Sequence, residues 1–180
     1  MTGEKPHTQG EAVTKEIERK WLVDELPFWF SLQDVKPEKI EMIAQGYLAV
    51  DGRGAVRIRQ KGEKYFLTYK SVPGVHAAER DELETELSAD QFNKLWPGTE
   101  GRRVEKTRYV FDHPEGLKIE LDIFEGANAG RMLAEIEFTS TDLADSFEAP
   151  AWFGLDVTTD KRYGNSSIAD NGFPAIVAEA

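Results

Sequence analysis

The chain contains no cysteine, which excludes disulfide bonds, thiolate metal sites and cysteine nucleophiles together. It also has no long hydrophobic run: none of its apolar stretches approaches the roughly 20 residues that a helix needs to cross a bilayer. The opening stretch MTGEKPHTQGEA lacks the apolar core of a signal peptide. We therefore expect a soluble, cytoplasmic protein in which residues 1–12 form a disordered N-terminal tail.

Basic residues are scarce relative to acidic ones, with 22 Lys and Arg against 33 Asp and Glu, and no Lys/Arg-rich run occurs. The formal net charge of −11 should repel nucleic acids and anionic membranes, so we expect neither as a partner. Charged residues nonetheless form 31% of the chain, more than the quarter or so that is usual in globular proteins. The fold must therefore accommodate more charged side chains, of both signs, than a typical globular protein does.

Strict alternation of polar and apolar residues is the dominant pattern, and it predicts β-strands. It is cleanest in GLKIELDIFEG, where apolar residues take the odd positions and charged residues the even ones. The turns HPEG and GANAG are short and rich in Gly, Pro and Asn, which favours antiparallel pairing over parallel crossovers. The alternating runs lie at residues 13–25, 45–50, 55–60, 63–71, 79–88, 103–113, 116–126 and 131–140.

Helix signals are fewer. Ser88 and Gln91 have the spacing of a capping box ahead of an apolar stripe, and Pro97 follows as a stop. These signals predict a helix near residues 88–96, and a helix is also an alternative to a strand over 79–88. The other segments predict a short helix and loop over 26–45, a second helix within 140–150, and a strand or turn with a polar segment over 151–169.

The charged faces of the predicted strands carry nearly balanced signs. The acids are Glu16, Glu18, Glu82, Glu84, Glu86, Glu120, Asp122, Glu135 and Glu137. The bases are Lys20, Arg57, Arg59, Lys70, Arg80, Lys106, Arg108 and Lys118. Carboxylates repeatedly stand two residues apart, about 7 Å along a strand, and a cation or basic neighbour is needed to compensate their repulsion.

Two arrangements fit these charged faces. A sheet with one face in water, such as a β-sandwich with a charged exterior, would carry solvated salt bridges. A closed barrel would instead gather the charges in its lumen, where an unpaired ion costs several kcal/mol, so that acids and bases must pair. Few neutral polar residues separate the charges, which favours the lumen.

A lumen of this kind suits a polyphosphate. Arginine and lysine can neutralise its dense negative charge, and the arginine fork matches phosphate oxygens. The carboxylates would bind Mg²⁺ or Mn²⁺, hard cations that bridge protein carboxylates to substrate phosphates.

The stretch EIERKWLV resembles the Glu-x-Glu-x-Lys signature that opens the CYTH superfamily, the triphosphate tunnel metalloenzymes. The likeness continues in order through QGYL, RIR, YFLTYKS, ERDELETEL, KTRY, IELDIFEG, LAEIEF and PAWFGLDVTTDKRYGN. It implies a mainly β fold: a closed eight-stranded antiparallel β-barrel tunnel with a few peripheral helices. The tunnel domain would span residues 13–169, and residues 170–180 would form a C-terminal tail.

The resemblance also implies roles for individual residues. Metal ligands are expected at Glu16, Glu18, Asp122, Glu135 and Glu137. Substrate-binding bases are expected at Lys20, Arg57, Arg59, Lys70, Arg80, Lys106, Arg108 and Lys161. Glu82 and Glu84 are expected to be acidic tunnel residues that support the metal or the basic side chains. Three further residues fit the alternation only, and we expect them to be solvent or rim charges: Glu86, Lys118 and Glu120. We expect the strand tyrosines Tyr47, Tyr65, Tyr69 and Tyr109 to serve packing.

The implied activity is metal-dependent hydrolysis of a triphosphate, with Glu16, Glu18 and Lys20 as the catalytic residues. Inorganic tripolyphosphate is the expected substrate, because no segment shows a pattern expected to bind a nucleobase or a thiazolium ring. Adenylate cyclase, thiamine triphosphatase, nucleoside triphosphatase and a non-catalytic polyphosphate or nucleotide sensor stay open as alternatives. The protein is expected to be a monomer or a homodimer.

Overall fold

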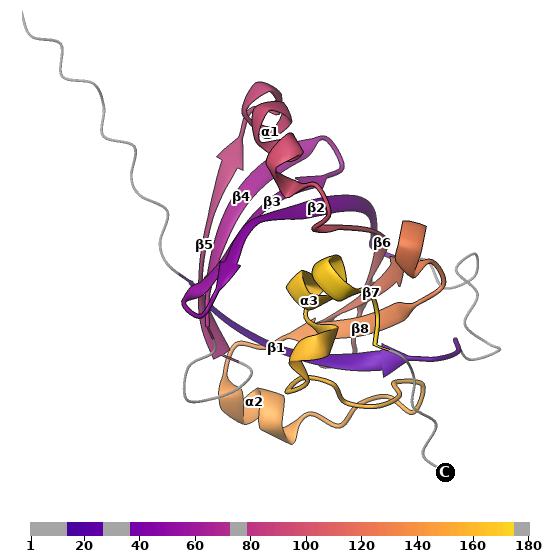
Figure 1. Cartoon of the computed structure of the whole chain (residues 1–180). Helices are drawn as coiled ribbons and strands as arrows, with labels where there is room; N and C mark the ends of the chain where they lie inside the picture. Colours follow the sequence, from indigo (N-terminus) through magenta and orange to yellow (C-terminus); the bar gives the residue numbers. More distant parts are fainter. Residues whose placement is uncertain (1–13, 27–36, 73–78, 175–180) are drawn as a thin grey trace, which may run out of the picture.

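The computed structural model describes residues 14–26, 37–72 and 79–174. Its strands close into an antiparallel barrel in the order β1-β5-β4-β3-β2-β6-β7-β8 (Figure 1), which confirms the predicted fold class. The strands are β1 (Thr14–Val23), β2 (Lys39–Asp51), β3 (Gly54–Lys61), β4 (Lys64–Ser71), β5 (Glu79–Leu87), β6 (Arg103–Asp112), β7 (Lys118–Phe124) and β8 (Met132–Glu137). The helices are α1 (Ala89–Leu95), α2 (Thr141–Ser146) and α3 (Asn165–Asn171), with 3-10 turns η1 (Trp96–Thr99), η2 (Gly126–Asn128) and η3 (Lys161–Tyr163). In the described ranges, no helix has the length and apolar character needed to cross a membrane.

The wall of the barrel is completed along β1 by a segment that is not a regular strand. β5 pairs only with the first residues of β1, which leaves one edge of its second half open. Residues 154–158 cover that edge: Val157 N donates to Lys20 O at 2.8 Å, and Leu22 N donates to Leu155 O at 2.9 Å. Arg19 holds the segment through an ion pair of 2.5 Å with Asp156. The segment predicted as a strand or turn within 151–169 therefore completes the barrel wall beside β1.

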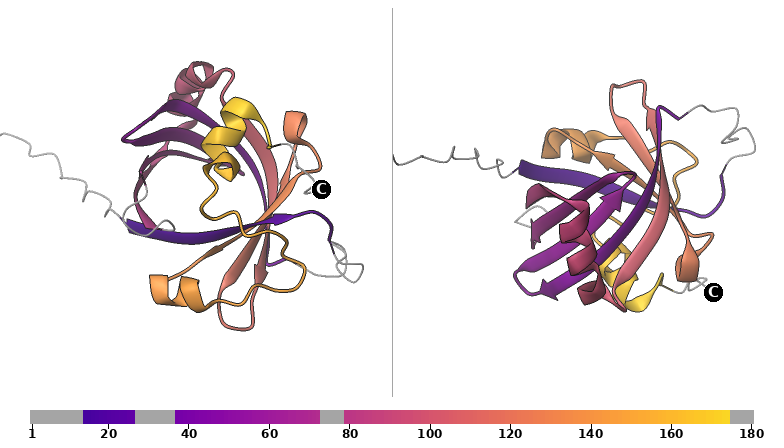
Figure 2. Two further views of the ribbon diagram at one scale, coloured as in Figure 1. Left: turned by 60° about the horizontal axis from the view of Figure 1, so that its bottom comes forward. Right: turned by 90° about the horizontal axis from the view of Figure 1, so that it is seen from above.

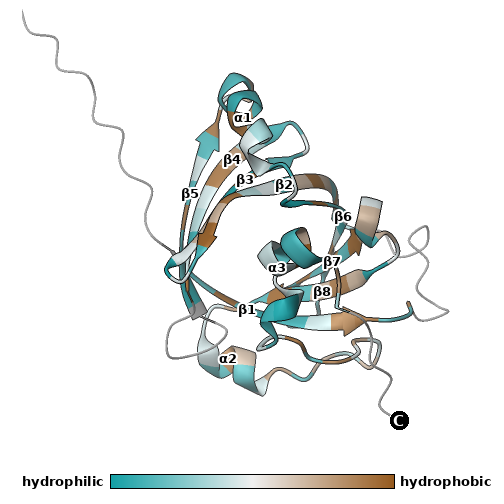
Figure 3. Ribbon diagram, viewed as in Figure 1, coloured by the Kyte–Doolittle hydropathy of each residue, from teal (hydrophilic) through white to brown (hydrophobic). Residues whose placement is uncertain are grey.

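The main hydrophobic core lies outside the barrel. Side chains alternate along each strand, so one face lines the interior and the other packs outward, and Figure 3 shows hydrophilic and hydrophobic residues as alternating bands along the strands. Trp21, Leu121 and Ile136 are buried on the outer face, beneath α2 and the chain that follows it. The rings of Trp21 and Phe153 lie 4.9 Å apart between centroids. The core therefore forms without filling the barrel interior.

A second apolar cluster covers one end of the barrel. There the inward-facing positions change from charged to apolar, and the C-terminal helices pack onto them; the cluster consists of Leu22, Val104, Phe124, Leu133, Val157, Tyr163 and Ile168. Phe173 adds an edge-on contact to Phe124 with centroids 4.8 Å apart. In the right-hand view of Figure 2, α3 lies at the opposite end of the barrel from the turn between β6 and β7.

The predicted α1 is confirmed together with its capping box. Ser88 N donates to Gln91 Oε1 at 2.8 Å, and Gln91 N donates to Ser88 Oγ at 3.2 Å. The residues before it form β5, so the strand interpretation of 79–88 is correct and the helical alternative is wrong. The second predicted helix, within 140–150, corresponds to α2.

One prediction is wrong, and one helix was not predicted. β2 begins at Lys39, so the helix and loop expected over 26–45 are wrong from that residue on, while residues 27–36 lie outside the described part. The outward positions of this strand carry Ile40 and Met42, which are 57% and 74% exposed and hide the alternation. The helix α3 was not predicted, because its sequence NSSIADN buries only Ile168 and shows no apolar stripe.

We expect Ile168→Ala to lower the free energy of unfolding by about 2–5 kcal/mol, because this side chain is 1% exposed in the cluster under α3. Leu143→Ala on α2, where the side chain is 49% exposed, should cost about 0.5 kcal/mol or less. Urea unfolding of both variants measures the difference. Equal costs would contradict the assignment of α3 to the folded core.

Candidate functional site

The inward-facing charges of the barrel line one cavity of about 920 Å³. The predicted site residues that line it are Glu16, Glu18, Lys20, Arg57, Arg59, Lys70, Arg80, Glu82, Lys106, Arg108, Glu135, Glu137 and Lys161. The remaining two, Glu84 and Asp122, lie behind this lining and bond to its basic side chains. The interpretation of the charged faces as a solvated outer surface is therefore wrong.

An alternating network of acids and bases lies where β1, β4 and β5 meet. Lys70 Nζ lies 2.5 Å from Glu16 Oε1 and 2.7 Å from Glu82 Oε2. Arg80 donates to Glu18 Oε1 at 3.2 Å. Since each carboxylate faces a cation from a neighbouring strand, the repulsion between acids two residues apart is compensated.

A second network crosses β6, β7 and β8 around Arg108. Its guanidinium donates two hydrogen bonds of 2.7 Å to Asp122, one of 2.6 Å to Glu135, and a further one to Glu120. Lys106 also contacts Asp122, whose side chain is fully buried. Burial disfavours the charge on Arg108, but Asp122 and Glu135 outweigh it and raise the pKa of Arg108.

Lys20 and Glu18 keep their charges in the cavity wall, where Lys20 is buried and Glu18 is half-buried. Burial alone would lower the pKa of Lys20, but Glu135 and Glu18 outweigh burial and raise it; Glu135 Oε1 lies 2.8 Å from Lys20 Nζ. Burial opposes ionisation of Glu18, yet Lys20, followed by Lys70 and Arg80, lowers the pKa of Glu18 to about 2. Lys20 is therefore a fixed positive charge.

Of the two arginines of β3, Arg57 is less well compensated than Arg59, whose guanidinium lies 2.8 Å from Glu84 Oε2. Arg57 is 6% exposed, but its nearest carboxylate among the described residues, that of Glu84, is 4.0 Å away, and its hydrogen bond to Thr68 Oγ1 is long at 3.4 Å. The Nε atoms of both Arg57 and Arg59 are buried without a hydrogen-bond partner among the residues that the structure describes. Burial, together with the charge of Arg57, lowers the pKa of Arg59. A buried donor without an acceptor is costly, so this wall of the cavity is suited to an anion.

Carboxylates accumulate on the opposite wall. Glu18 and Glu137 are direct cross-strand partners, as are Glu120 and Glu135. No ion pair joins Glu137 to another described residue, and partial burial, with Glu120 and Glu18 nearby, raises the pKa of Glu137. Like charges in direct register destabilise a sheet unless something compensates them.

This acidic wall fits a hard divalent cation. Among the described residues, Glu16 Oε2 is buried with no hydrogen bond and only a long ion pair, 3.5 Å, to Arg80 Nε. The neighbouring side chains present carboxylate oxygens, the ligands that Mg²⁺ and Mn²⁺ prefer. In the described part of the chain, three or more acidic or histidine side chains do not converge on one point. The carboxylates turn instead toward the basic side chains, which a bound polyanion would draw away.

Several cavity residues were not identified from the sequence. Glu120 was expected to be a solvent or rim charge, but it lines the cavity and bonds to Arg108; its place in the alternation of β7 was the available signal. Tyr47, expected to serve packing, and Gln45 also line the cavity from β2. Asn165 belongs to α3 and accepts a hydrogen bond from Lys106 at 3.4 Å, and no strand pattern could have indicated it. Glu86 and Lys118 are exposed, as expected.

Comparisons with known proteins agree with this architecture. The model of the CYTH domain matches residues 14–167. An inorganic triphosphatase of Nitrosomonas europaea is 45% identical over 155 residues, covering 86% of this chain and 96% of the relative. An inorganic triphosphatase of Acetivibrio thermocellus is 33% identical over 160 residues, covering 88% and 96%.

Solved structures show the same barrel. The crystal structure of an inorganic triphosphatase, 44% identical, superposes with a TM-score of 0.62 over 86% of this chain and 97% of the other. A putative adenylyl cyclase from Hippeastrum with a dominant triphosphatase activity shares the fold at a TM-score of 0.55 and 18% identity, covering 72% of this chain and 82% of the other. With the family match extending over most of its length, the chain belongs to the CYTH domain family.

Proposed function

We propose that this protein is an inorganic triphosphatase that hydrolyses tripolyphosphate to pyrophosphate and phosphate with Mg²⁺ or Mn²⁺. The observation that carries the proposal is the buried and incompletely paired Arg57, beside Arg59, in a cavity lined by basic residues from five strands. The names of the two relatives described above support the choice of substrate.

The basic residues would hold the phosphate chain. Arg57 and Arg59 offer Nε–H groups that no other described residue accepts from. Positive charge around the same space is added by Lys20, Lys70, Lys106 and Arg108. Such fixed charges stabilise the negative charge that develops on the leaving pyrophosphate, and they need no rearrangement during the reaction. The role inferred for Lys20 is that of a fixed cation, since its raised pKa opposes loss of its proton.

The acids would hold the metal. Glu16, Glu18, Glu135 and Glu137 present carboxylate oxygens to the cavity, and Asp122 would act indirectly, by orienting Lys106 and Arg108. When bound, the divalent cation supplies charge neutralisation at phosphate oxygens and makes an attacking water more acidic. In the overall reaction, the oxygen of water bonds to a terminal phosphorus and the bridging oxygen departs with pyrophosphate.

The rival substrates need recognition beyond the phosphates. Of the described residues that line the cavity, only Tyr47 is aromatic, so a nucleobase or a thiazolium ring would find little surface on which to stack. This observation favours tripolyphosphate over ATP and thiamine triphosphate. We also infer a cytoplasmic location and a monomer or homodimer that binds neither nucleic acid nor membrane, supported by the absence of cysteine and the net charge of −11.

A substrate panel tests the proposed activity. We expect phosphate release from tripolyphosphate with Mg²⁺ or Mn²⁺ to exceed release from ATP and thiamine triphosphate, and EDTA to abolish it. Cyclic AMP formed from ATP would contradict the proposal. Tight binding of tripolyphosphate without any turnover would indicate a sensor instead.

We expect Arg57→Met to lower kcat/KM for tripolyphosphate about 100-fold, because an anion-binding group in a desolvated site is lost. The variant should melt at the same or a higher temperature without ligand, because a poorly paired buried cation is removed. Arg53→Met, whose side chain is 90% exposed at the turn after β2, is the control and should leave both quantities unchanged. Activity of Arg57→Met within about threefold of wild type would contradict the role of Arg57.

For the acidic wall, we expect Glu18→Gln and Glu137→Gln each to lower metal-dependent turnover at least about 100-fold. Calorimetry in EDTA should show tripolyphosphate binding that is unchanged or tighter, since a negative charge is removed from the cavity. Glu86→Gln, an exposed change on β5, is the matched control. Normal turnover and metal affinity in both variants would exclude these residues as metal ligands.

A further inference from the structure

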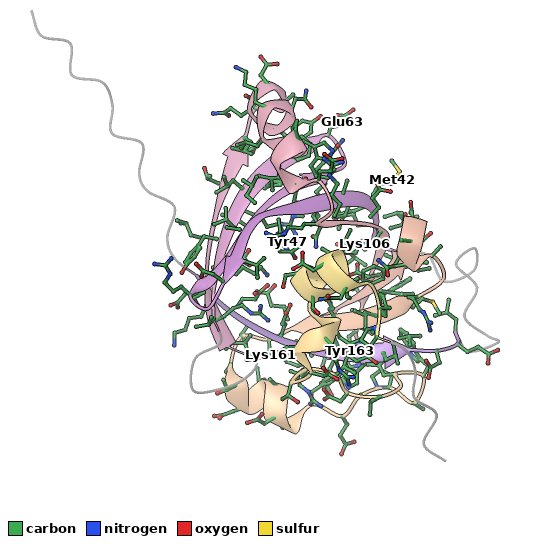
Figure 4. All side chains as sticks on the ribbon, viewed as in Figure 1. Met42, Tyr47, Glu63, Lys106, Lys161 and Tyr163 are labelled. Carbon is green, nitrogen blue, oxygen red and sulfur yellow. The ribbon has the colours of Figure 1, made fainter. Side chains whose placement is uncertain are left out.

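Tyr47 extends from β2 toward the cavity rather than into a hydrophobic core. Its side chain is 5% exposed, it lines the cavity, and it belongs to neither of the two apolar clusters. In Figure 4 the labels of Tyr47 and Lys106 lie within the ring of strands, while Met42, on the other face of β2, projects outside it. The expectation that Tyr47 serves packing therefore does not account for its position.

The hydrogen-bond partners of Tyr47 leave its proton without an acceptor. A phenol offers one O–H donor and an oxygen that accepts. Gln45 Nε2 donates to Tyr47 Oη at 3.3 Å. In the part of the chain that the structure describes, no group accepts a hydrogen bond from the Tyr47 O–H.

The charges around Tyr47 are positive. Arg57 stands directly opposite in the register between β2 and β3, and Lys20 and Arg80 are close enough to act on the phenol electrostatically. Burial nonetheless outweighs these cations and raises the pKa of Tyr47, so the group stays protonated at neutral pH. The phenol is therefore a neutral donor directed at a space in which cations would gather an anion.

We propose that Tyr47 donates its hydroxyl hydrogen to a non-bridging phosphate oxygen of the bound triphosphate, and this proposal rests on the proposed function. A phosphate oxygen accepts only and carries charge, so the bond would be of the stronger, charge-assisted kind. Gln45, by donating to the phenol oxygen, fixes the phenol so that its hydrogen points away from the Gln45 amide. Tyr47 thus belongs to the phosphate clamp although it is neutral.

Tyr47→Phe tests this inference, because it removes only the hydroxyl. Calorimetry in EDTA should show tripolyphosphate binding about 10- to 100-fold weaker than in wild type, as expected for loss of a buried hydrogen bond to a charged group. The matched control is Tyr109→Phe, which removes a hydroxyl from a side chain that packs against the outer core. Thermal melting without ligand should be nearly the same for both variants.

Unchanged binding by Tyr47→Phe, with wild-type protein binding well, overturns the role of Tyr47 and leaves the proposed function intact. Failure of wild-type protein to bind tripolyphosphate overturns the proposed function itself. Should Tyr47→Phe fail to fold, NMR of wild-type protein carrying ¹³Cζ-tyrosine gives a second test. One of the five tyrosine signals should then move on addition of tripolyphosphate while its phenol stays protonated, and five unmoved signals would overturn the proposal.

Discussion

The compensation of buried charge inside the barrel is the constraint on which the rest of this structure depends. Removing an ion from water costs several kcal/mol unless counter-charges and hydrogen bonds replace its hydration. Arg108 meets this demand with three carboxylates from β7 and β8. Arg57 does not meet it within the described part of the chain, where its nearest carboxylate, Glu84, lies 4.0 Å away. The incompletely compensated positions define where an anion would bind.

This constraint explains why the hydrophobic core lies outside the barrel and at one end of it. An interior filled with apolar side chains would stabilise the fold but leave no space for a charged ligand. Trp21 and its neighbours instead pack beneath α2 on the outer wall, and Ile168 of α3 helps to cover one end. Stability and the site are thereby built from opposite faces of the same strands.

Alternation along the strands made the inward-facing set predictable from the sequence. A period of two assigned Glu16, Lys70 and Glu135 to one face, and the resemblance to a tunnel family indicated that this face is enclosed. The pairing of these residues could not be predicted, because it depends on register across strands far apart in the sequence, as in the contact of Arg108 with Glu135. The pairing of residues 154–158 with β1 and the helix α3 could not be predicted either, since backbone hydrogen bonds and a single buried isoleucine leave no periodic signal.

A crystal structure of the protein with tripolyphosphate in the presence of EDTA tests the central claim most directly. The account predicts phosphate oxygens within hydrogen-bond distance of the Nε atoms of Arg57 and Arg59, which have no partner in residues 14–26, 37–72 and 79–174. Phosphate bound only on the outer surface of the barrel, with the internal ion pairs unchanged, would contradict it.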